Sequence, residues 1–553
     1  MFDILIKNGL VVDGSGEKAF AADVAVKDGR IAQVGRIDGE AAQVIDAAGR
    51  IVAPGFIDPH THFDVQLLWD GAARPSLQHG VTAIVPGNCS LSLAPLRAKD
   101  RPELVGMFQV IEEMPPEAFA GAFEWSWEDF AGYRAAIEPN LQINVAPLVG
   151  HSAIRLWVMG QASAERAATS NEVRAMQDVL RQCLEAGAIG LSTSYIDTDP
   201  AGRPVPSRWA QHAELDALCA ILGEFGRVLQ IVPELYDIDL AVARIDQLAE
   251  LSLKHGIATT YSPIFDTPRT PNYVERQMAR VEEQAARGAR VHPQMQTRPN
   301  ELSFSLLRPG LFFNRFRGWG RLLRKPVAER IAALRDPQVV ETLIAATGPD
   351  EGAAVLGRAT ARGGDSLPAD LAGRTLGSIA AERGQTPARA LISLSLECGL
   401  DAAFRATMSH DDTARIGRFL AHPLVHIGAS DGGAHLTSFA TYGDTGYLFS
   451  EFVRKSGALT LEQAVRKITA EAAEIWGMKQ RGRLAPGWFA DVVVFDAETI
   501  DRGPERPVFD MPGEGMRYTR DGVGVDAVLV NGEVVHAAGA YTDARPGVVV
   551  EGR

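Results

Sequence analysis

Cysteine is scarce in this chain of 553 residues, which contains four of them. They lie far apart and form no CxxC pair, so a disulfide framework is excluded and a reducing compartment is favoured. The chain has no run of about 18 or more apolar residues, which excludes a membrane-spanning helix. Its first residues, MFDILIKNG, carry an acid at position 3 and lack the apolar stretch of a signal peptide. We therefore expect a cytoplasmic protein.

Basic residues are outnumbered by acidic ones. The sequence has 55 Lys and Arg against 69 Asp and Glu, a formal net charge of −14. This balance argues against general binding of nucleic acid or of an anionic membrane, although a local basic pocket is compatible with it. At about 150 residues per domain, the length suggests three or four domains, or fewer if one is a large α/β barrel. The sequence leaves a homo-oligomer open.

Both ends of the chain alternate apolar and polar residues with the period of two that is typical of strands. Near the start these segments are FDILIKNGLVVDGSG and ADVAVKDGRIAQVG, and near the end they are GWFADVVVFD and VDAVLVNGEVVHAAG. Neither end is long enough to bury a good core alone. We therefore predict one small β-sandwich domain built from residues 1–57 and 480–553. Two unrelated hairpins packed on the central body are the alternative.

The central region, residues 58–479, alternates short strand-like segments with helical stretches, which is typical of a parallel α/β sheet. Most segments begin apolar and finish in polar or metal-binding residues. They are 51–62, 82–90, 143–152, 187–195, 227–234, 257–265, 289–297 and 424–432. Because the carboxyl ends of barrel strands converge on one mouth, this pattern predicts an α/β protein with a (β/α)₈ TIM-type barrel. A doubly wound open sheet is the alternative, but no GxGxxG follows an early strand.

A further stretch, from about residue 299 to 422, is too long for one barrel crossover. Its segments PVAERIAALRDPQVVETLIAATG and QTPARALISLSLECG have a helical pattern. We therefore predict a largely helical insertion between strands seven and eight.

The clearest local motif is GFIDPHTHFD at residues 55–64. His60 and His62 occupy alternate positions at the end of the first strand, so both imidazoles face one side and can reach one ion. At the end of the eighth strand, Asp431 in GASDGG supplies a carboxylate that can bind a divalent ion and take a proton from water. Surface histidines and a simple turn are the alternatives for each motif alone. Together the motifs predict a metal centre at the barrel mouth.

With these motifs the chain resembles the amidohydrolase superfamily, and within it the D-aminoacylase (N-acyl-D-amino-acid deacylase) branch. The resemblance covers nearly the whole length and includes DILIKNGLVVDGSG, GNC at 87–89, GHSAIRLWVMG at 150–160, GAIGLSTS at 187–194 and RGRLAPGWFADVVVFD at 481–496. It implies that Cys89 occupies the metal-binding place that a carboxylated lysine has in many superfamily members. A buried core thiol is the alternative for Cys89.

The resemblance fails at two positions. The branch carries histidines at the ends of strands five and six, which help to hold its tightly bound zinc. Here those strands read LQIVPELYD and TTYSPIFD, and the matching places fall near Val232 or Pro233 and at Pro263. None of these side chains can bind a metal, and Glu234 is the nearest that could substitute. We therefore predict one Zn²⁺ per chain, with another divalent metal as the alternative, bound by His60, His62, Cys89 and Asp431.

Other polar residues at the strand ends are candidates for catalysis and substrate binding. His151, which closes the third strand and recurs in the family pattern, is predicted to assist catalysis. Arg298 has the geometry to anchor a substrate carboxylate through two hydrogen bonds. The predicted substrate-binding residues are Gln294, Gln296, Arg298, His435, Ser192 and Glu234. Packing or loop-capping roles are the alternatives for several of them.

These observations predict a metal-dependent hydrolase that cleaves the C–N bond of a small amide. In this interpretation the metal activates water, and Asp431 accepts the proton and passes it to the leaving amine. The resemblance implies an N-acyl amino acid of D configuration as substrate, and Arg298 would suit its carboxylate. Two alternatives remain: a cyclic amide or lactone hydrolase, and a barrel that has lost its chemistry and serves in binding or assembly. The missing lysine argues against the first, and the surviving ligand set against the second.

Overall fold

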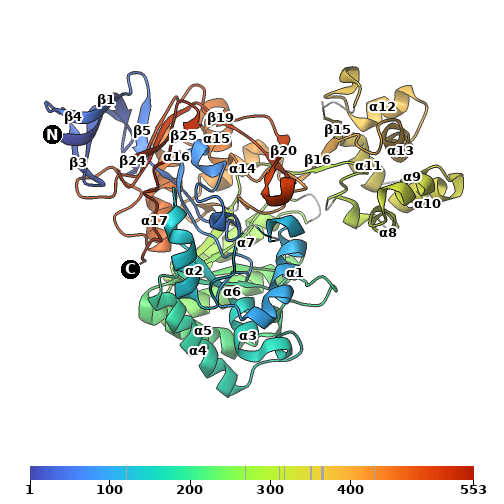
Figure 1. Ribbon diagram of the computed structural model, residues 1–553, viewed down its shortest axis with the longest axis horizontal. Coiled ribbons are helices and arrows are strands. Elements are labelled where there is room, and N and C mark those ends of the chain that lie inside the picture. The colour runs from blue at the N-terminus through green and yellow to red at the C-terminus, as the bar shows by residue number, and fades with distance from the viewer. Residues whose placement is uncertain are drawn as a thin grey trace. The chain divides into compact units, whose positions relative to one another are not determined.

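The computed structural model describes the whole chain except residues 120, 122, 268–269, 311, 317, 349–350, 363–366, 429 and 553. The chain forms two compact units (Figure 1). The first contains Met1–Arg298, Asp412–His435 and Thr441–Arg553, and the second contains Pro299–Asp411 and Leu436–Ala440. None of the helices in these described ranges is long and apolar enough to cross a membrane.

A ring of parallel strands forms the centre of the first unit. Its strands are, in order, β6 (Phe56–Asp58), β7 (Val81–Ile84), β8 (Asn144–Val145), β9 (Leu148–Gly150), β10 (Gly190–Ser194), β11 (Val228–Val232), β12 (Thr259–Tyr261), β13 (Val291–Met295) and β17 (His426–Ile427). β8 and β9 share one position in the ring. The amide of Ala146 donates to the end of β7, and the amide of Leu148 donates to a residue just after β7. Pro147, which lies between them, has no N–H and so cannot donate to the neighbouring strand β10.

The ring closes between β17 and β6. Thr61 and Gly432 form a parallel bridge. The amide of His62 donates to the carbonyl of Gly432 over 2.7 Å, and the amide of Asp431 donates to the carbonyl of His60 over 3.2 Å. The strands lie within or overlap the segments expected from the sequence, and the prediction of a (β/α)₈ barrel is confirmed.

The barrel interior changes from apolar to polar along its axis. One core cluster contains Ile57, Leu148 and Val228 of the strands together with Trp476 of α17 (Ala470–Trp476). Two residues further along β11, Gln230 faces the same side as Val228 and lies beside Thr260 in register. The apolar layers therefore sit toward the amino ends of the strands, and polar side chains face the mouth.

Helices connect the barrel strands in sequence: α4 (Ser170–Glu185), α5 (His212–Phe225), α6 (Ile238–His255) and α7 (Tyr273–Ala286). α4 begins with a capping box, in which Thr169 and Glu172 exchange side-chain-to-backbone hydrogen bonds. α6 ends at Gly256, whose φ of 69° is left-handed. These local signals delimit the helices that return the chain to the next strand.

The two ends of the chain share one nine-stranded sheet. It contains β1 (Phe2–Val11), β2 (Phe20–Lys27), β3 (Arg30–Gly35), β4 (Ala41–Asp46), β5 (Ile51–Pro54), β18 (Val492–Phe495), β23 (Val525–Val530), β24 (Glu533–Ala537) and β25 (Ala540–Tyr541). β5 and β18 join the two halves as antiparallel neighbours, with Val52 opposite Val494. Both of these valines are buried in the core of the sheet. The termini therefore do not form two unrelated hairpins.

The second unit is mainly helical. It contains α8 (Trp319–Leu323), α9 (Val327–Leu334), α10 (Pro337–Thr347), α11 (Glu351–Arg358), α12 (Leu376–Glu382) and α13 (Pro387–Glu397), with a small sheet of β14 (Asn300–Phe304), β16 (Phe404–Ser409) and β15 (Thr360–Ala361). The unit ends at Asp411, before the residue 422 expected from the sequence. The next helix, α14 (Thr413–Leu420), belongs to the first unit, where Arg415 pairs with Asp266 and Glu275.

Candidate metal centre

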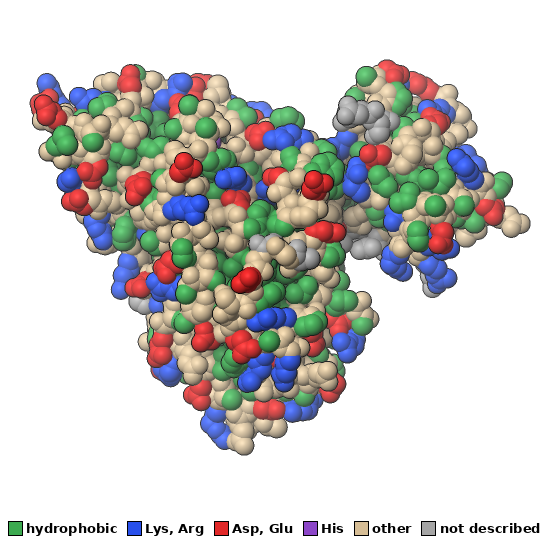
Figure 2. All heavy atoms as spheres, viewed as in Figure 1, with side chains coloured by type: hydrophobic (Ala, Val, Ile, Leu, Met, Phe, Trp, Pro, Cys, Tyr) green, Lys and Arg blue, Asp and Glu red, His purple; other side chains and the backbone are tan. Residues whose placement is uncertain are grey.

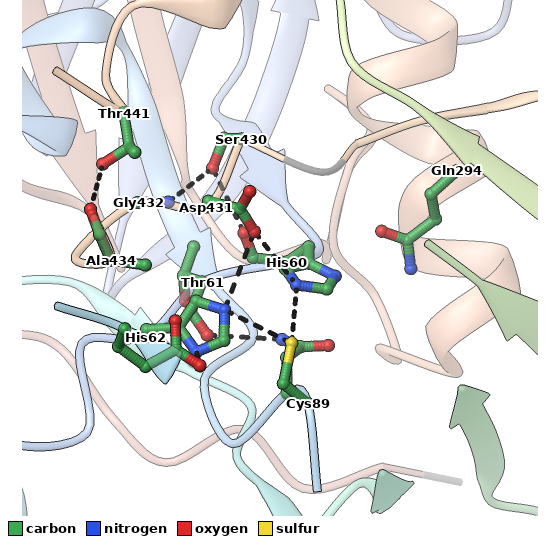
Figure 3. A network of polar contacts seen from close by, with 12 residues as sticks. His60, Thr61, His62, Cys89, Gln294, Ser430, Asp431, Gly432, Ala434 and Thr441 are labelled. Carbon is green, nitrogen blue, oxygen red and sulfur yellow. Dashed lines mark hydrogen bonds and ion pairs between the residues drawn. The ribbon is translucent and has the colours of Figure 1, made fainter. Parts of the chain in front are cut away.

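Four potential ligands converge at the carboxyl ends of three barrel strands (Figure 3). His60 and His62 follow β6, Cys89 follows β7, and Asp431 follows β17. Cys89 Sγ lies 3.7 Å from His60 Nε2 and 3.8 Å from His62 Nε2. Asp431 Oδ1 lies 3.2 and 3.7 Å from the same two nitrogens. The ligand atoms of His60, His62 and Cys89 therefore lie within 4.8 Å of one another, and Asp431 lies beside the two histidines.

The spacing of the His60, His62 and Cys89 ligand atoms is compatible with binding of one metal ion. Zn–N distances of about 2.0–2.1 Å and Zn–S of about 2.3 Å place neighbouring ligand atoms roughly 3.3–3.6 Å apart. The separations of 3.2–3.8 Å agree with this spacing. Two imidazoles, a thiol and a carboxylate also have the chemistry that zinc prefers.

The Cys89 side chain is aimed by an unusual local backbone. Cys89 and Ser90 both have left-handed φ values, 54° and 65°. At Gly87, φ is 86° and a Cβ would lie 2.4 Å from the carbonyl oxygen of Leu148, so only glycine fits. Asn88 donates to the carbonyls of Thr61 and Val85, which ties this turn to the loop that carries the histidines. The GNC tripeptide thus forms a turn that presents the thiol to the site.

The protonation of the site depends on burial and on contacts between the ligands. Burial alone would raise the pKa of Asp431, but hydrogen bonds from His60 and His62 lower that pKa well below its usual value. Burial lowers the pKa of His62 to about 4, which favours the neutral imidazole needed for metal binding. Burial raises the pKa of the Cys89 thiol well above its usual value. A cation is therefore needed to stabilise the thiolate.

A second layer of the site was missed by the sequence analysis. Glu112, which follows α1 (Arg101–Ile111), is 1% exposed, and its Oε1 lies 3.2 Å from His62 Nδ1. This contact places a carboxyl group beside His62 Nδ1, on the side of the ring away from Nε2 and the metal position. Burial raises the pKa of Glu112 well above its usual value. Its neighbour Glu113 places Oε2 3.4 Å from His435 Nδ1.

Glu112→Leu should weaken metal binding by about 10–100-fold, because it removes the carboxyl group that contacts the His62 ring. The measurement is competition for the metal with a chelator of known affinity. Glu112→Gln is the matched control, since its amide keeps an acceptor oxygen of similar reach. Equal affinity of the wild type and the Glu112→Leu variant would show that His62 is oriented without Glu112.

His151 does not occupy the catalytic position predicted for it. It begins α3 (His151–Met159) and is fully buried. Its Nδ1 lies 3.0 Å from Thr193 Oγ1, and its Nε2 lies 2.9 Å from Glu214 Oε1. Glu214 also accepts a hydrogen bond from Arg155. Because both ring nitrogens are engaged, His151 joins β10, α3 and α5 and has no nitrogen to offer to a reacting group.

Two charged residues predicted to bind substrate are paired within the protein. Arg298 lies 3.3 Å from the carboxylate of Asp444 and donates to the carbonyl of Ser430 over 2.8 Å. It therefore anchors the loop that carries Asp431. Glu234 pairs with Arg244 of α6 over 2.8 Å. Arg298 and Glu234 therefore both have charged partners within the protein.

Ser192 and Gln296 also make structural hydrogen bonds. Ser192 Oγ donates to the carbonyl of Gly87 and accepts from the amide of Ser90 over 3.2 Å, so it supports the Cys89 turn. Gln296 is buried, and its Nε2 donates to the carbonyl of Arg298 over 2.9 Å. Their polar groups hold the strand ends.

Gln294 and His435 remain candidates for substrate binding. Gln294 lies on β13 and faces the same space as His60 (Figure 3). Its Nε2 donates to Thr260 Oγ1 over 3.0 Å, while its Oε1 is buried without a hydrogen-bond partner in the described part of the chain. The His435 side chain is 22% exposed and adjoins Glu113. Both positions can therefore receive a group that enters the mouth.

The structure places no metal-binding side chain at the ends of strands five and six within the described residues. Val232 ends β11 and, by alternation, faces the same side as Gln230. Ser262 follows β12, is 1% exposed and carries only a hydroxyl. Glu234 does not substitute for the missing ligands, because Arg244 holds its carboxylate.

Comparisons with known proteins agree with this geometry. A family model described as the amidohydrolase family matches residues 43–536. An N-acyl-D-glutamate deacylase of Alcaligenes xylosoxydans xylosoxydans is 30% identical over 99% of this chain and 96% of its own length. A D-aminoacylase of the same organism is 29% identical over 99% of this chain and 97% of its own.

A solved structure extends the likeness to three dimensions. It is an N-acyl-D-glutamate deacylase from Bordetella bronchiseptica, complexed with zinc and a phosphonate inhibitor that mimics the tetrahedral intermediate. It is 28% identical, covers 100% of this chain and 99% of its own, and has a TM-score of 0.68. The chain belongs to the amidohydrolase family, in its D-aminoacylase branch.

Proposed function

We propose that this protein hydrolyses the amide bond of a small N-acyl amino acid or related amide, with one zinc ion bound by His60, His62, Cys89 and Asp431. The observation that carries this proposal is the group of His60, His62 and Cys89, whose ligand atoms lie within 4.8 Å of one another, with Asp431 beside both histidines. The activities named for the relatives, deacylation of N-acyl-D-glutamate and other N-acyl-D-amino acids, support the substrate class.

The bound ion would supply a Lewis acid that polarises the amide carbonyl and acidifies water. Asp431 is suited to move the proton, because its side chain is 25% exposed and its pKa is held low by the two histidines. It accepts a proton from the attacking water and gives it to the amine nitrogen as the C–N bond breaks. Glu112 holds the His62 ring, and Arg298 holds the loop of Asp431 through Ser430.

The distribution of charge on the surface is also compatible with a small-molecule substrate. On the face shown in Figure 2, Lys and Arg side chains are interspersed with Asp and Glu rather than gathered into one broad patch. Together with the net charge of −14, this distribution does not favour a polyanion as substrate.

The purified protein should contain about one tightly bound metal equivalent per chain, because strands five and six lack the second set of ligands. Elemental analysis after dialysis against a weak chelator measures this number, and reconstitution with zinc tests the identity of the metal. Hydrolysis of a panel of acyclic N-acyl amino acids and cyclic amides tests the activity. Two tightly bound equivalents would refute the one-metal assignment, and faster turnover of the cyclic amides would favour the alternative reaction.

A further inference from the structure

An acidic side chain outside the ligand set lies at the mouth of the barrel. Asp197 follows β10 by three residues, and its backbone amide donates to Ser194 Oγ over 3.3 Å. One carboxylate oxygen, Oδ2, is shielded from solvent and has no hydrogen-bond partner among the described residues. A shielded carboxylate oxygen without a partner is costly, so this position favours a donor from a bound molecule.

Asp197 follows a strand that supports the turn of one proposed ligand, Cys89. The strand that leads to it contacts the Cys89 turn, because the amide of Ser90 donates to Ser192 Oγ over 3.2 Å. Burial raises the pKa of Asp197 to about 6, and the charge of Asp431 adds to that rise. The charge of Asp197 in turn contributes, after burial, to the raised pKa of Cys89. The charge of Asp431 therefore acts on Asp197, and the charges of both carboxylates act on Cys89.

The cations nearest to Asp197 are engaged with other groups. Arg208 directs Nη1 to the backbone carbonyls of Ile196 and Asp197 at 3.1 and 3.2 Å. His435 lies against Glu113 at 3.4 Å. Neither therefore neutralises Asp197 by a direct ion pair in the described part of the chain.

Two buried glutamines in the barrel interior also indicate which chemical groups the site can bind. Gln230 and Gln294 are both 0% exposed. Each uses its Nε2 in a hydrogen bond within the protein, and each leaves its Oε1 without a partner among the described residues. Both free oxygens are acceptors. The mouth therefore offers acceptors and negative charge to an entering molecule.

We propose that Asp197 determines specificity by binding an ammonium or guanidinium group on the substrate, so that basic N-acyl amino acids are preferred and acidic ones are disfavoured. This inference rests on the proposed hydrolysis at the neighbouring metal centre. It distinguishes this chain from the relatives, which are named for N-acyl-D-glutamate and N-acyl-D-aspartate. A carboxylate side chain would meet Asp197 and Asp431 as like charges, whereas an ammonium group would gain a charge-assisted hydrogen bond.

The test compares kcat/KM of the metal-loaded enzyme for N-acetyl-lysine, N-acetyl-norleucine and N-acetyl-glutamate, each as both enantiomers. Lysine and norleucine have the same carbon chain and differ in the terminal ammonium. We expect lysine to exceed norleucine by about tenfold or more, and glutamate to be the poorest. Asp197→Asn should remove the preference for lysine, so that the kcat/KM values for lysine and norleucine become similar. Glu234→Gln is the control, because it removes a paired charge after the neighbouring strand.

Each outcome decides the proposal. A wild-type preference for norleucine or glutamate overturns it, and so does a lysine preference that survives Asp197→Asn. If none of the compounds is hydrolysed, the proposed function fails, and binding measured by calorimetry then tests Asp197 separately. Tighter binding of N-acetyl-lysine than of N-acetyl-norleucine, lost in Asp197→Asn, supports the role of Asp197 without turnover. Equal binding of the two compounds overturns it.

Discussion

Asp431→Asn should lower kcat by about 10²–10⁴-fold and leave the protein folded. The amide has the size of the carboxylate and keeps an oxygen that can face the metal position, but it cannot accept the proton of water at neutral pH. Asp431 Oδ1 is 3.2 Å from His60 Nε2 and 3.7 Å from His62 Nε2, and its side chain remains partly exposed to the mouth. The measurement is steady-state turnover of the best N-acyl amino acid found in the substrate panel.

The control for this variant is Glu234→Gln, which removes a carboxylate that Arg244 already holds away from the reacting groups. It should change kcat by less than about twofold. Metal content and circular dichroism of the Asp431→Asn variant separate a lost proton acceptor from a lost ion or a lost fold. Turnover near the wild-type value in a metal-loaded Asp431→Asn variant would mean that another group moves the proton.

The barrel and the first ligands could be predicted because their signals are local. His60 and His62 alternate on one strand end, and their common orientation follows from the pleat alone. The strand positions follow from short apolar segments that end in polar residues, since parallel barrel strands place those ends at one mouth. Cys89 came from the family resemblance, and the structure supplies its physical basis in the left-handed turn after Gly87.

The other side-chain contacts of the site join segments that lie far apart in the sequence, so no local sequence pattern predicts them. Glu112, which follows α1, contacts the ring of His62, although the two residues lie 50 positions apart in the sequence. Arg298 was predicted to bind a substrate carboxylate, but it contacts Asp444, which lies 146 positions further along the sequence. His151 was predicted to assist catalysis, but its ring contacts Glu214. In each case the contact is set by a residue distant in the sequence, which the local pattern does not identify.

Cys89→Ser should weaken metal binding by more than about 100-fold, and activity should fall with it at any metal concentration below saturation. Loss of an outer contact to a ligand costs about 10–100-fold, and loss of the ligand itself should cost more. A serine hydroxyl does not ionise near neutral pH, so it cannot replace a thiolate that lies 3.7 and 3.8 Å from the two imidazole nitrogens. Metal affinity by chelator competition and thermal unfolding with and without metal provide the measurements.

The same variant separates the two interpretations of this cysteine. If Cys89 were only a small core residue, serine would lower the stability of the metal-free protein and leave metal affinity intact. If it is a ligand, the metal-free forms should unfold at similar temperatures, and only the wild type should gain stability when metal is added. Cys398→Ser is the matched control, since Cys398 follows α13 in the second unit and should leave the metal-dependent gain unchanged. A full metal-dependent gain in the Cys89→Ser variant would remove the thiol from the ligand set and leave two histidines and Asp431 to hold the ion.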